Sequence, residues 1–456
     1  MFDLKGTRTS DFSKSTRRAF LKNTSLGVLS SAMCATFLSS NMGQCASSPN
    51  DRFKIGFIGC GGMGNGDARE LAHFGDIVAL ADVDKTHLEW FKSTPEIVSK
   101  PNEVFTTQDY RHVLDRSDIE VVGISTPDHW HVKIAMEALL SGKHVFCQKP
   151  LTLTIEENRL IREAVKRTGK VFQVGTQQRL DKDHFMLATL LVRKGLLGKI
   201  KRVVVTLNTG PKGGPFPTET PPSSLDWNMF LGQTPYVDYC SQRARGTFRY
   251  WYEYSGGQFT DWGAHHVDCA LWALDQLGPG KGPTSVEPIH VEHTSPIGED
   301  SLPKTTDCYN TAVHFNMKVL LTNQVELIVE DDNFNGIMFE GTEGRIFVNR
   351  GKITGKPIED KLQDSISEEE FVALNKGKPL TWHKDNFFQC IREGGTPASD
   401  VDSHTYSMNL CHLLGIASRL GRKINWDPVN ETITGDQEAA TFMKRIPRKG
   451  FEFPAL

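Results

Sequence analysis

Several features that mark particular classes of protein are missing from this sequence. Its 456 residues include 52 Lys or Arg and 55 Asp or Glu, so the formal net charge is −3 and no basic field is present to neutralise nucleic-acid phosphates. The nine cysteines are scattered singly, with no CxxC or other metal-ligand spacing, and there is no internal repeat. With 38% hydrophobic and 23% charged residues, the composition excludes a disordered chain and a bundle of membrane spans. We therefore expect a folded protein of two domains that does not bind nucleic acid.

The first 48 residues have the layout of a targeting peptide. Residues 15–22 read STRRAFLK, a weakly apolar stretch follows over residues 26–38, and small residues come after it. This segment resembles a twin-arginine signal, and its apolar stretch is too short and too rich in Ser to span a bilayer. Gln44 is a poor fit to lipoprotein processing at Cys45, so we expect ordinary cleavage near residues 45–49.

The predicted export route determines what we expect of the mature protein. The twin-arginine machinery carries folded proteins, often with a cofactor inside, so we predict that machinery as a partner and a periplasmic or other extracytoplasmic location. Residues 1–48 carry six basic and two acidic side chains, and their removal changes the formal charge from −3 to −7. Seven cysteines remain, and because the chain folds in the reducing cytoplasm we expect thiols rather than disulfides.

A dinucleotide-binding fingerprint begins at residue 53. The apolar run FKIGFI leads into Gly59-x-Gly61-x-x-Gly64, and a second apolar run over residues 77–81 ends at Asp82, at the expected separation. Gly59 permits the tight turn, Gly61 lets the backbone approach a pyrophosphate, and Gly64 lets helix and strand pack. Asp82 would accept from a ribose 2′-hydroxyl and repel a 2′-phosphate, which favours NAD over NADP. A glycine-rich turn without a ligand is the alternative.

Alternating strand and helix patterns continue after the fingerprint. We predict strands over residues 119–125 and 144–147, with a helix over about residues 132–141 between them. Such alternation is typical of a doubly wound parallel sheet, in which ligands gather at the carboxyl ends of the strands. Residues 125–131 and 148–150 fall at those ends and are therefore candidate site residues.

At these positions the chain resembles the Gfo/Idh/MocA family, which includes glucose–fructose oxidoreductase and inositol dehydrogenase. The matching motifs are the glycine loop, the TPxxxH stretch Thr126–His131, a form of the EKP motif at Gln148–Pro150, the segment Gly256–His265 leading into DxGxH, and the GTxG turn within Phe339–Ile346. The likeness runs from about residue 53 to the end of the chain.

The resemblance implies two domains with the active site between them. An N-terminal Rossmann domain would span residues 49–175, and a C-terminal substrate-binding α/β domain with an open, mostly antiparallel sheet would span residues 176–456. The implied cofactor is tightly bound NAD, with NADP less favoured. Together with the fingerprint, the resemblance predicts cofactor contacts from Gly59, Gly61, Gly62, Met63, Gly64, Asp82, Thr126, Pro127, His131, Gln148 and Lys149.

The same resemblance assigns the catalytic residues. In the family the EKP lysine and the DxxxH pair carry substrate binding and proton transfer, which maps here to Lys149, Asp261 and His265. Gln148 replaces the usual Glu, so local pKa values and cofactor orientation do not transfer. Oxidising a secondary alcohol needs hydride removal and a base for the hydroxyl proton, and both Lys149 and His265 suit that role. If a helix begins at residue 261, Asp261 and His265 share one face and Asp261 can orient the imidazole.

Aromatic and polar residues near these motifs are candidates for sugar binding. Aromatic faces can stack on sugar C–H groups while polar side chains bind hydroxyls. The predicted substrate contacts are Lys149, Gln177, Arg179, Arg249, Trp251, Asp261, His265 and His266. A metal site is the rival interpretation, because His129 and His131 are two residues apart. Asp261, His265 and His266 would add further metal ligands. No closed zinc spacing is present, so we predict no metal.

The C-terminal half reads as a meander of strands followed by helices. The Pro- and Gly-rich residues 211–222 are predicted to form a loop over the cleft, and residues 383–422 a helical stretch broken at 393–397. An open sheet face needs covering, so we expect a homo-oligomer that pairs these faces. The strand-like apolar runs are residues 200–207, 309–315, 319–329 and 345–348.

Three functions remain open at this point. The first is an exported oxidoreductase of a sugar, sugar derivative or cyclitol that transfers hydride to a bound nicotinamide cofactor. The second is net non-redox glycoside cleavage or epimerisation through a transient keto-sugar, with the hydride returned in the same cycle. The third is a catalytically silent carbohydrate-binding protein on the same fold. Retention of Lys149, Asp261 and His265 counts against the third.

Overall fold

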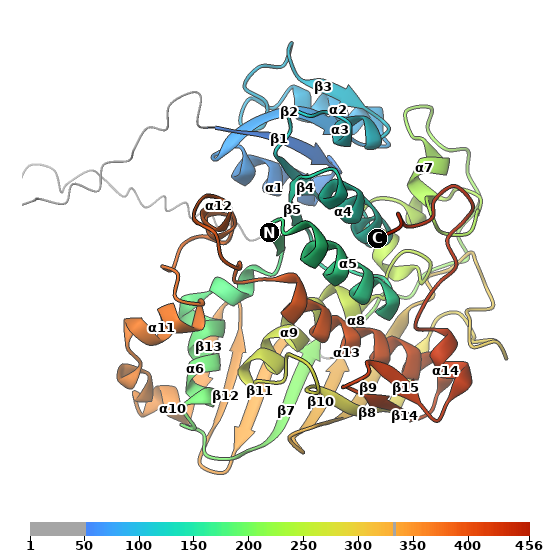
Figure 1. Cartoon of the computed structure of the whole chain (residues 1–456). Helices are drawn as coiled ribbons and strands as arrows, with labels where there is room; N and C mark the ends of the chain where they lie inside the picture. The colour runs from blue at the N-terminus through green and yellow to red at the C-terminus, as the bar shows by residue number, and fades with distance from the viewer. Residues whose placement is uncertain (1–51, 332–333) are drawn as a thin grey trace, which may run out of the picture. The chain divides into compact units, whose positions relative to one another are not determined.

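The computed structural model describes residues 52–331 and 334–456 (Figure 1). The predicted export signal lies in residues 1–48, outside the described residues. None of the helices that the structure describes combines the length and apolar character needed to cross a membrane. The seven cysteines between residues 52 and 456 are all buried free thiols.

The first half of the described chain forms a six-stranded sheet. Its strands run in the order β3-β2-β1-β4-β5-β6, and every neighbouring pair is parallel. The predicted doubly wound parallel sheet is therefore confirmed, with the strand order of a Rossmann fold. The strands are β1 Phe53–Ile58, β2 Gly75–Ala81, β3 Phe105–Thr107, β4 Val121–Ile124, β5 His144–Cys147 and β6 Phe172–Val174.

Helices cover both faces of this sheet, which explains why its central strands are apolar throughout. The residues of α3, α4 and α5 share one buried cluster with the side chains of one sheet face. The residues of α1 and α2 share a second cluster with those of the opposite face. The helices are α1 Gly62–Leu71, α2 Lys85–Lys92, α3 Arg111–Leu114, α4 His131–Leu140 and α5 Ile155–Thr168.

The C-terminal part of the chain returns to this first sheet. Helix α12 (His383–Glu393) places Phe387 and Phe388 in the cluster beside α1 and α2, and the ring of Phe388 stacks on Phe74 at 4.5 Å. At the very end of the chain, Phe451 and Leu456 pack against the opposite cluster. The cofactor half is thus completed by residues that lie more than 200 positions further along the sequence.

The second half is built on a nine-stranded sheet. The order is β13-β12-β11-β7-β10-β9-β8-β14-β15, and all neighbouring pairs are antiparallel except β7 and β10. This confirms the predicted second, mostly antiparallel sheet. The strands are β7 Ile200–Leu207, β8 Pro283–His293, β9 Ala312–Leu321, β10 Glu326–Asp331, β11 Gly336–Gly341, β12 Arg345–Asn349, β13 Lys352–Gly355, β14 Ile424–Asp427 and β15 Thr432–Thr434.

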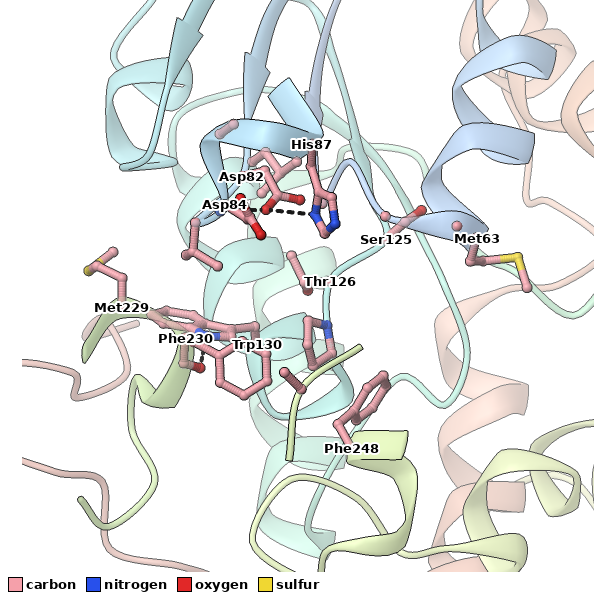
Figure 2. A pocket seen from close by; sticks show the side chains of 18 of the residues that line it. Met63, Asp82, Asp84, His87, Ser125, Thr126, Trp130, Met229, Phe230 and Phe248 are labelled. Carbon is pink, nitrogen blue, oxygen red and sulfur yellow. Dashed lines mark hydrogen bonds and ion pairs between the residues drawn. The ribbon is translucent and has the colours of Figure 1, made fainter. Parts of the chain in front are cut away.

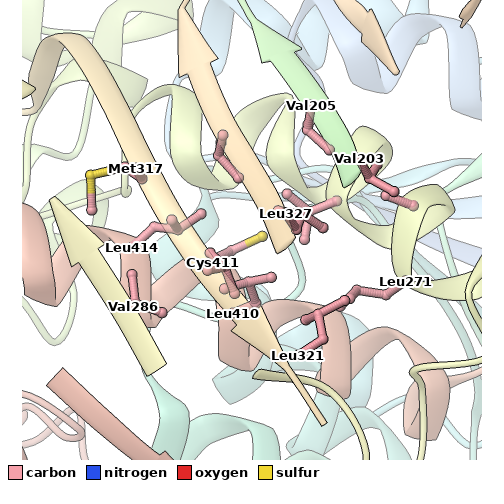
Figure 3. Packing of buried hydrophobic residues seen from close by; sticks show 14 of the residues in the cluster. Val203, Val205, Leu271, Val286, Met317, Leu321, Leu327, Leu410, Cys411 and Leu414 are labelled. Atoms are coloured by element: carbon pink, nitrogen blue, oxygen red, sulfur yellow. The ribbon is translucent and has the colours of Figure 1, made fainter. Parts of the chain in front are cut away.

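One face of the second sheet carries the largest core of the molecule. Alternate residues of its strands, such as Val203, Val205 and Leu327, pack against Leu271 of α9 and Leu410 of α13 (Figure 3). Figure 1 shows α9 and α13 lying between this sheet and the first one. The remaining helices of this half are α6 Leu187–Arg193, α7 Trp227–Leu231, α8 Gln258–Asp261, α9 Gly263–Ala273, α10 Lys356–Glu359, α11 Glu368–Leu374, α13 Val401–Leu420 and α14 Gln437–Thr441.

The opposite face of the sheet alternates charged with apolar side chains. Arg202, Lys318 and Glu326 lie there, with Lys318 Nζ 2.7 Å from Glu326 Oε2, and Met338 and Phe347 are only partly buried. This is the face through which we predicted a homo-oligomer, and that assembly stays a prediction.

Two local expectations are wrong. The apolar run 319–329 is divided between β9 and β10 by a turn at residues 322–325, where Gln324 adopts φ +65°. A turn of polar residues breaks the run because the two strands pair with each other. The helix expected from residue 261 is also interrupted, since α8 ends at Asp261 and α9 begins at Gly263.

Candidate functional site

The main cavity, of about 630 Å³, lies at the carboxyl ends of β1, β2, β4 and β5. Its second wall is formed by residues 222–249 of the C-terminal half, so both halves of the chain line it. Figure 2 shows Asp82 and His87 at one end of this pocket and Trp130, Phe230 and Phe248 at the other. This position matches the rule that open α/β sheets bind ligands beyond the carboxyl ends of their strands.

The glycine loop has the geometry that a pyrophosphate site requires. Gly59 has φ +95°, and a Cβ built on it would lie 2.5 Å from the carbonyl carbon of Ser125. A Cβ on Gly64 would meet the carbonyl oxygen of Gly59 at 2.0 Å. By contrast, Gly61 and Gly62 have open space at that position, at the amino end of α1. The loop therefore leaves backbone N–H groups accessible to an anion at a helix N-terminus.

Asp82 is fixed at the end of β2 by the backbone. Its Oδ2 accepts from Cys60 N at 2.6 Å and its Oδ1 from Asp84 N at 2.8 Å, while His87 Nδ1 lies 3.3 Å away. The carboxylate still lines the pocket, as expected for a ribose contact. The described wall beside it consists of Asp84, His87, Trp90 and Gln108, without Lys or Arg.

The predicted cofactor residues of the TPxxxH stretch divide into two groups. Thr126 and Pro127 line the pocket, and Thr126 Oγ1 is buried without a hydrogen-bond partner, so it is available to a ligand. His131 instead lies beneath the pocket, with Nδ1 2.7 Å from the carbonyl oxygen of Pro150 and Nε2 2.9 Å from that of Thr126. Burial lowers the pKa of His131 to about 4, against the opposing effect of the two carbonyls, and both ring nitrogens are turned to the backbone rather than to the pocket.

The Gln148 side chain is part of a buried polar network around Asp67 of α1. Gln148 Nε2 donates to Asp67 Oδ2 at 2.7 Å, and Ser125 Oγ donates to the same oxygen at 2.8 Å. Lys384 of α12 donates to Asp67 Oδ1 at 2.7 Å. A Glu at position 148 would place two carboxylates side by side, whereas the amide supplies the donor that Asp67 needs. The motif itself lacks an acidic side chain, but the carboxylate of Asp67 lies in hydrogen-bond contact with its Gln148.

Of the three predicted catalytic residues, Lys149 and Asp261 are in contact with each other where the two halves meet. Lys149 Nζ lies 2.5 Å from Asp261 Oδ1, and Arg249 Nε donates to the same oxygen at 3.1 Å. Burial alone would raise the pKa of Asp261, but Lys149 and Arg249 outweigh it and hold the pKa below its usual value. Lys149 and Arg249 line the pocket, so a charged cluster meets the dinucleotide loop at one cavity.

The two histidines of α9 have different surroundings. His265 is 4% exposed, and its Nδ1 has no hydrogen-bond partner. Burial, together with the Lys149 charge, holds the pKa of His265 well below its usual range, so the imidazole is neutral and only weakly basic. Asp261 is committed to Lys149 and Arg249 and does not orient His265 in the way its sequence spacing allowed. His266 is fully buried between Trp262 and Phe185, stacked on both rings, as a core residue.

Three further predicted substrate contacts are not among the described residues that line the pocket. Arg179 forms a buried two-point ion pair with Asp268, at 2.6 and 2.7 Å. Trp251 is fully buried, with the Arg243 guanidinium 3.9 Å from its ring. Gln177 is exposed on a short turn after β6. Of the residues predicted to contact substrate, Lys149 and Arg249 reach the cavity directly.

Asp128 lies in the predicted candidate segment 125–131, but no role of its own is predicted for it from the sequence. It lines the pocket at 3% exposure, and Ser255 Oγ donates to its Oδ2 at 2.5 Å. Burial raises the pKa of Asp128 to about 7, although Arg249 and Ser255 oppose the shift. The available signal was its position between Pro127 and His131, inside a motif already assigned to the site. The pocket also has an aromatic wall of Trp130, Phe230, Tyr239 and Phe248, of which Trp130 alone belongs to the predicted segment 125–131.

The metal interpretation gains no support from the geometry. One ring nitrogen of His129, Nε2, is 2.8 Å from the carbonyl oxygen of Phe230, and both ring nitrogens of His131 face backbone carbonyls. Among residues 52–331 and 334–456, no group of three or more His, Cys, Asp or Glu side chains is arranged to hold a metal ion.

These features define a two-domain protein with a dinucleotide-type pocket closed by a second α/β domain. Two family models match it: the oxidoreductase family NAD-binding Rossmann fold over residues 53–176, and the oxidoreductase family C-terminal α/β domain over residues 189–453. The chain therefore belongs to the Gfo/Idh/MocA oxidoreductase family.

Known relatives differ in how much of the chain they match. A glycosyl hydrolase family 109 protein of Shewanella pealeana is 31% identical over 204 residues, which cover 41% of this chain and 44% of that protein. The chain thus spans less than half the length of this curated relative.

Two solved structures share the fold over most of the chain. The WlbA dehydrogenase of Chromobacterium violaceum, in complex with NADH and UDP-GlcNAcA, is 16% identical with a TM-score of 0.57, over 83% of this chain and 97% of that one. The aldose-aldose oxidoreductase of Caulobacter crescentus, in complex with glycerol, is 17% identical with a TM-score of 0.56, over 82% and 99%.

The glycine geometry predicts the effect of one added methyl group. In Gly64→Ala the new Cβ would clash with the Gly59 carbonyl and displace the loop, at a cost of about 1–3 kcal/mol. We expect the Kd for NAD, measured by calorimetric titration of cofactor-free protein, to rise about tenfold or more.

Gly66→Ala is the matched control on the same helix. A Cβ at Gly66 has open space, and Ala is favoured over Gly in a helix by about 1 kcal/mol, so NAD affinity should stay unchanged. Equal NAD affinity in the two variants would show that the loop does not bind the dinucleotide.

Proposed function

We propose that this protein is an NAD-dependent oxidoreductase of a sugar, a sugar derivative or a cyclitol that keeps its cofactor tightly bound. The observation that carries the proposal is the meeting of the Lys149, Asp261 and Arg249 cluster with the glycine-loop pocket. Sugar-related fold neighbours, one of them in complex with NADH, support a carbohydrate substrate.

The pocket residues fit a nicotinamide dinucleotide. The glycine loop and the amino end of α1 would hold the pyrophosphate, and the unpartnered Thr126 Oγ1 would receive a polar group. Asp82, with no Lys or Arg in the described wall beside it, favours a free ribose 2′-hydroxyl and hence NAD over NADP. When bound, the nicotinamide supplies the acceptor and the donor of a hydride.

Proton transfer falls to the charged cluster. Lys149 is held by Asp261 at the pocket wall, where its Nζ can contact a substrate hydroxyl and move its proton. His265 is the weaker candidate base, because burial holds its pKa well below its usual range and it does not line the described pocket. Arg249 would compensate negative charge that develops on the substrate oxygen.

A second candidate function is net non-redox cleavage of a glycoside. Transient oxidation of a sugar hydroxyl to a ketone makes a neighbouring C–H acidic. A base would remove that proton, a C=C bond would form as the glycosidic C–O bond breaks, and the leaving oxygen would take a proton from an acid. Water would then add across the C=C bond, and hydride would return to the ketone. Asp128 favours this reading, because a buried carboxyl with a pKa near 7 is a suitable proton donor. The likeness to a glycosyl hydrolase family 109 protein supports it as well.

We also propose that the protein is exported by the twin-arginine route and forms a homo-oligomer through its second sheet. Tight cofactor binding agrees with export, because no free nicotinamide pool exists outside the cytoplasm. The residue pattern STRRAFLK supports the route, and the partly apolar face around Met338 and Phe347 supports the assembly.

The proposal predicts both a bound cofactor and a characteristic assay result. Denatured protein should release NAD, and holoenzyme incubated with a panel of free sugars, cyclitols and glycosides should turn over at least one of them. A lasting change in absorbance at 340 nm indicates net redox, whereas product without that change indicates a closed cycle. In Lys149→Met we expect turnover to fall by about 10²–10⁴ with NAD still bound.

Lys143→Met is the matched control, at the opposite end of the same strand. Lys143 Nζ donates only to the carbonyl oxygens of Arg116 and Ile119, away from the pocket, so turnover per folded molecule should stay within about twofold of wild type. Ligand binding without turnover in the wild-type protein, unaffected by Lys149→Met, would instead indicate a silent binding protein.

The Asp128 carboxyl predicts a pH dependence of glycoside cleavage. Its raised pKa keeps the carboxyl protonated below about pH 7, so proton donation is present at low pH and is lost as the pH rises through 7. In the wild type we expect kcat/KM to fall as the pH rises through about 7. In Asp128→Asn we expect kcat/KM to be low at every pH and not to fall in this range. If kcat/KM of Asp128→Asn still falls at the same pH as in the wild type, Asp128 is excluded as the donor.

A further inference from the structure

A second, smaller cavity lies away from the dinucleotide pocket. Its volume is about 40 Å³, and no residue lines both cavities. It is bounded by the start of α5, the glycine-rich segment with α8, the strands β8 and β9, helix α13 and the region after α14. A single water needs about 10–15 Å³ of such space, so the cavity holds about three waters or one small polyatomic ion, but not a sugar.

Two arginines line this cavity. Arg419 of α13 and Arg445 both line it, and their guanidinium carbons lie 4.1 and 3.9 Å from the ring centre of Tyr252. Arg445 Nη1 donates to the carbonyl oxygens of Tyr252 and Glu253. Arg419 has ring contacts with Tyr252 and Phe442 only, and its Nε is buried without a hydrogen-bond partner.

No acidic side chain in the described part of the chain forms an ion pair with either arginine. The neighbouring acids have other partners: Glu157 Oε2 accepts from Leu153 N at 2.7 Å, and Glu253 pairs with Arg243 and Asn310. Burial makes His293 and His412 of the lining neutral, with pKa values of about 4 and about 3. The cavity is therefore lined by two arginines without an ion-pair partner among the described residues. The Arg445 charge acts on Glu157, but burial still raises the pKa of that carboxyl to about 7.

The positive charge of the two arginines lowers the pKa of Tyr252. Burial alone would raise the pKa of its phenol, yet the two guanidiniums outweigh burial and lower it. They also disfavour each other, since Arg445 contributes to the lowered pKa of Arg419. Two like charges in a partly closed space are unfavourable unless an anion joins them.

We infer that the cavity between Arg419 and Arg445 is a binding site for a single oxyanion group. Guanidinium N–H groups match the geometry of phosphate, sulfate and carboxylate oxygens, and hydroxyls from Thr154 and Thr311 stand at the same lining as further donors. The volume limits the buried part to one such group, either as a free ion or as a substituent of a larger molecule that extends outside. The site is independent of the proposed activity, although Thr260 of its lining directly precedes Asp261.

The test is binding of inorganic phosphate and of sulfate to the purified holoenzyme. We expect each anion to raise the Tm saturably, and by more than sodium chloride of equal ionic strength does. Calorimetry should give one binding site per chain. Glucose 6-phosphate and glucose, measured in parallel, show whether the oxyanion group is a free ion or part of a larger ligand. Tighter binding of the sugar phosphate identifies a substituent on a larger ligand, and tighter binding of inorganic phosphate identifies a free ion.

Arg419→Met keeps the apolar stem and removes the charge. We expect its Kd for phosphate to rise about tenfold or more, because a charge-assisted contact is lost. Arg422→Met, one turn along at the end of α13, removes an exposed arginine paired with Asp436 and Glu438 and should leave the phosphate effect unchanged. If Arg419→Met does not fold, Arg445→Gln takes its place.

The inference is overturned if neither oxyanion stabilises the wild type beyond the chloride control. It is also overturned if the arginine variant binds phosphate as tightly as the wild type does.

Discussion

The ion pair between Lys149 and Asp261 joins the two halves of the chain at the pocket, and the arrangement of the site depends on it. Lys149 lies two residues after the end of β5, and Asp261 ends α8, so a contact of 2.5 Å fixes the second domain against the carboxyl edge of the first sheet. Both side chains are mostly buried, and breaking such a pair leaves an uncompensated charge. Arg249 shares the same carboxylate, which brings the aromatic wall of residues 222–249 over the cavity.

A second buried network supports the cofactor side in the same way. Asp67 accepts from Gln148, Ser125 and Lys384, and Lys384 belongs to a helix from the far end of the chain. The position of Gln148 beside Lys149 is therefore set by a residue more than 200 positions away. With Gln rather than Glu at position 148, the side-chain amide donates to the Asp67 carboxylate, which supplies the negative charge beside the motif.

The parts of this structure that depend on local pattern could be predicted from the sequence. The glycine spacing, the strand at residues 144–147 and the placement of Lys149 at a strand end follow from short-range rules. The positions of the Arg179 and Trp251 side chains do not, because a polar segment after a strand has the same sequence pattern whether its arginine faces a cavity or a buried partner such as Asp268. Asp128 acquires its raised pKa from burial, against the opposing effects of Arg249 and of the Ser255 hydrogen bond, a contact across 127 positions that no periodicity encodes.

Both proposed reactions begin with removal of hydride from a sugar carbon, and that step can be observed directly. Holoenzyme in its oxidised form is mixed rapidly with an accepted sugar, and absorbance at 340 nm is followed before the first turnover ends. The account predicts formation of reduced nicotinamide, up to one equivalent per chain, in the wild type and its loss in Asp261→Asn. Product formation with no transient absorbance at any sugar concentration would contradict it.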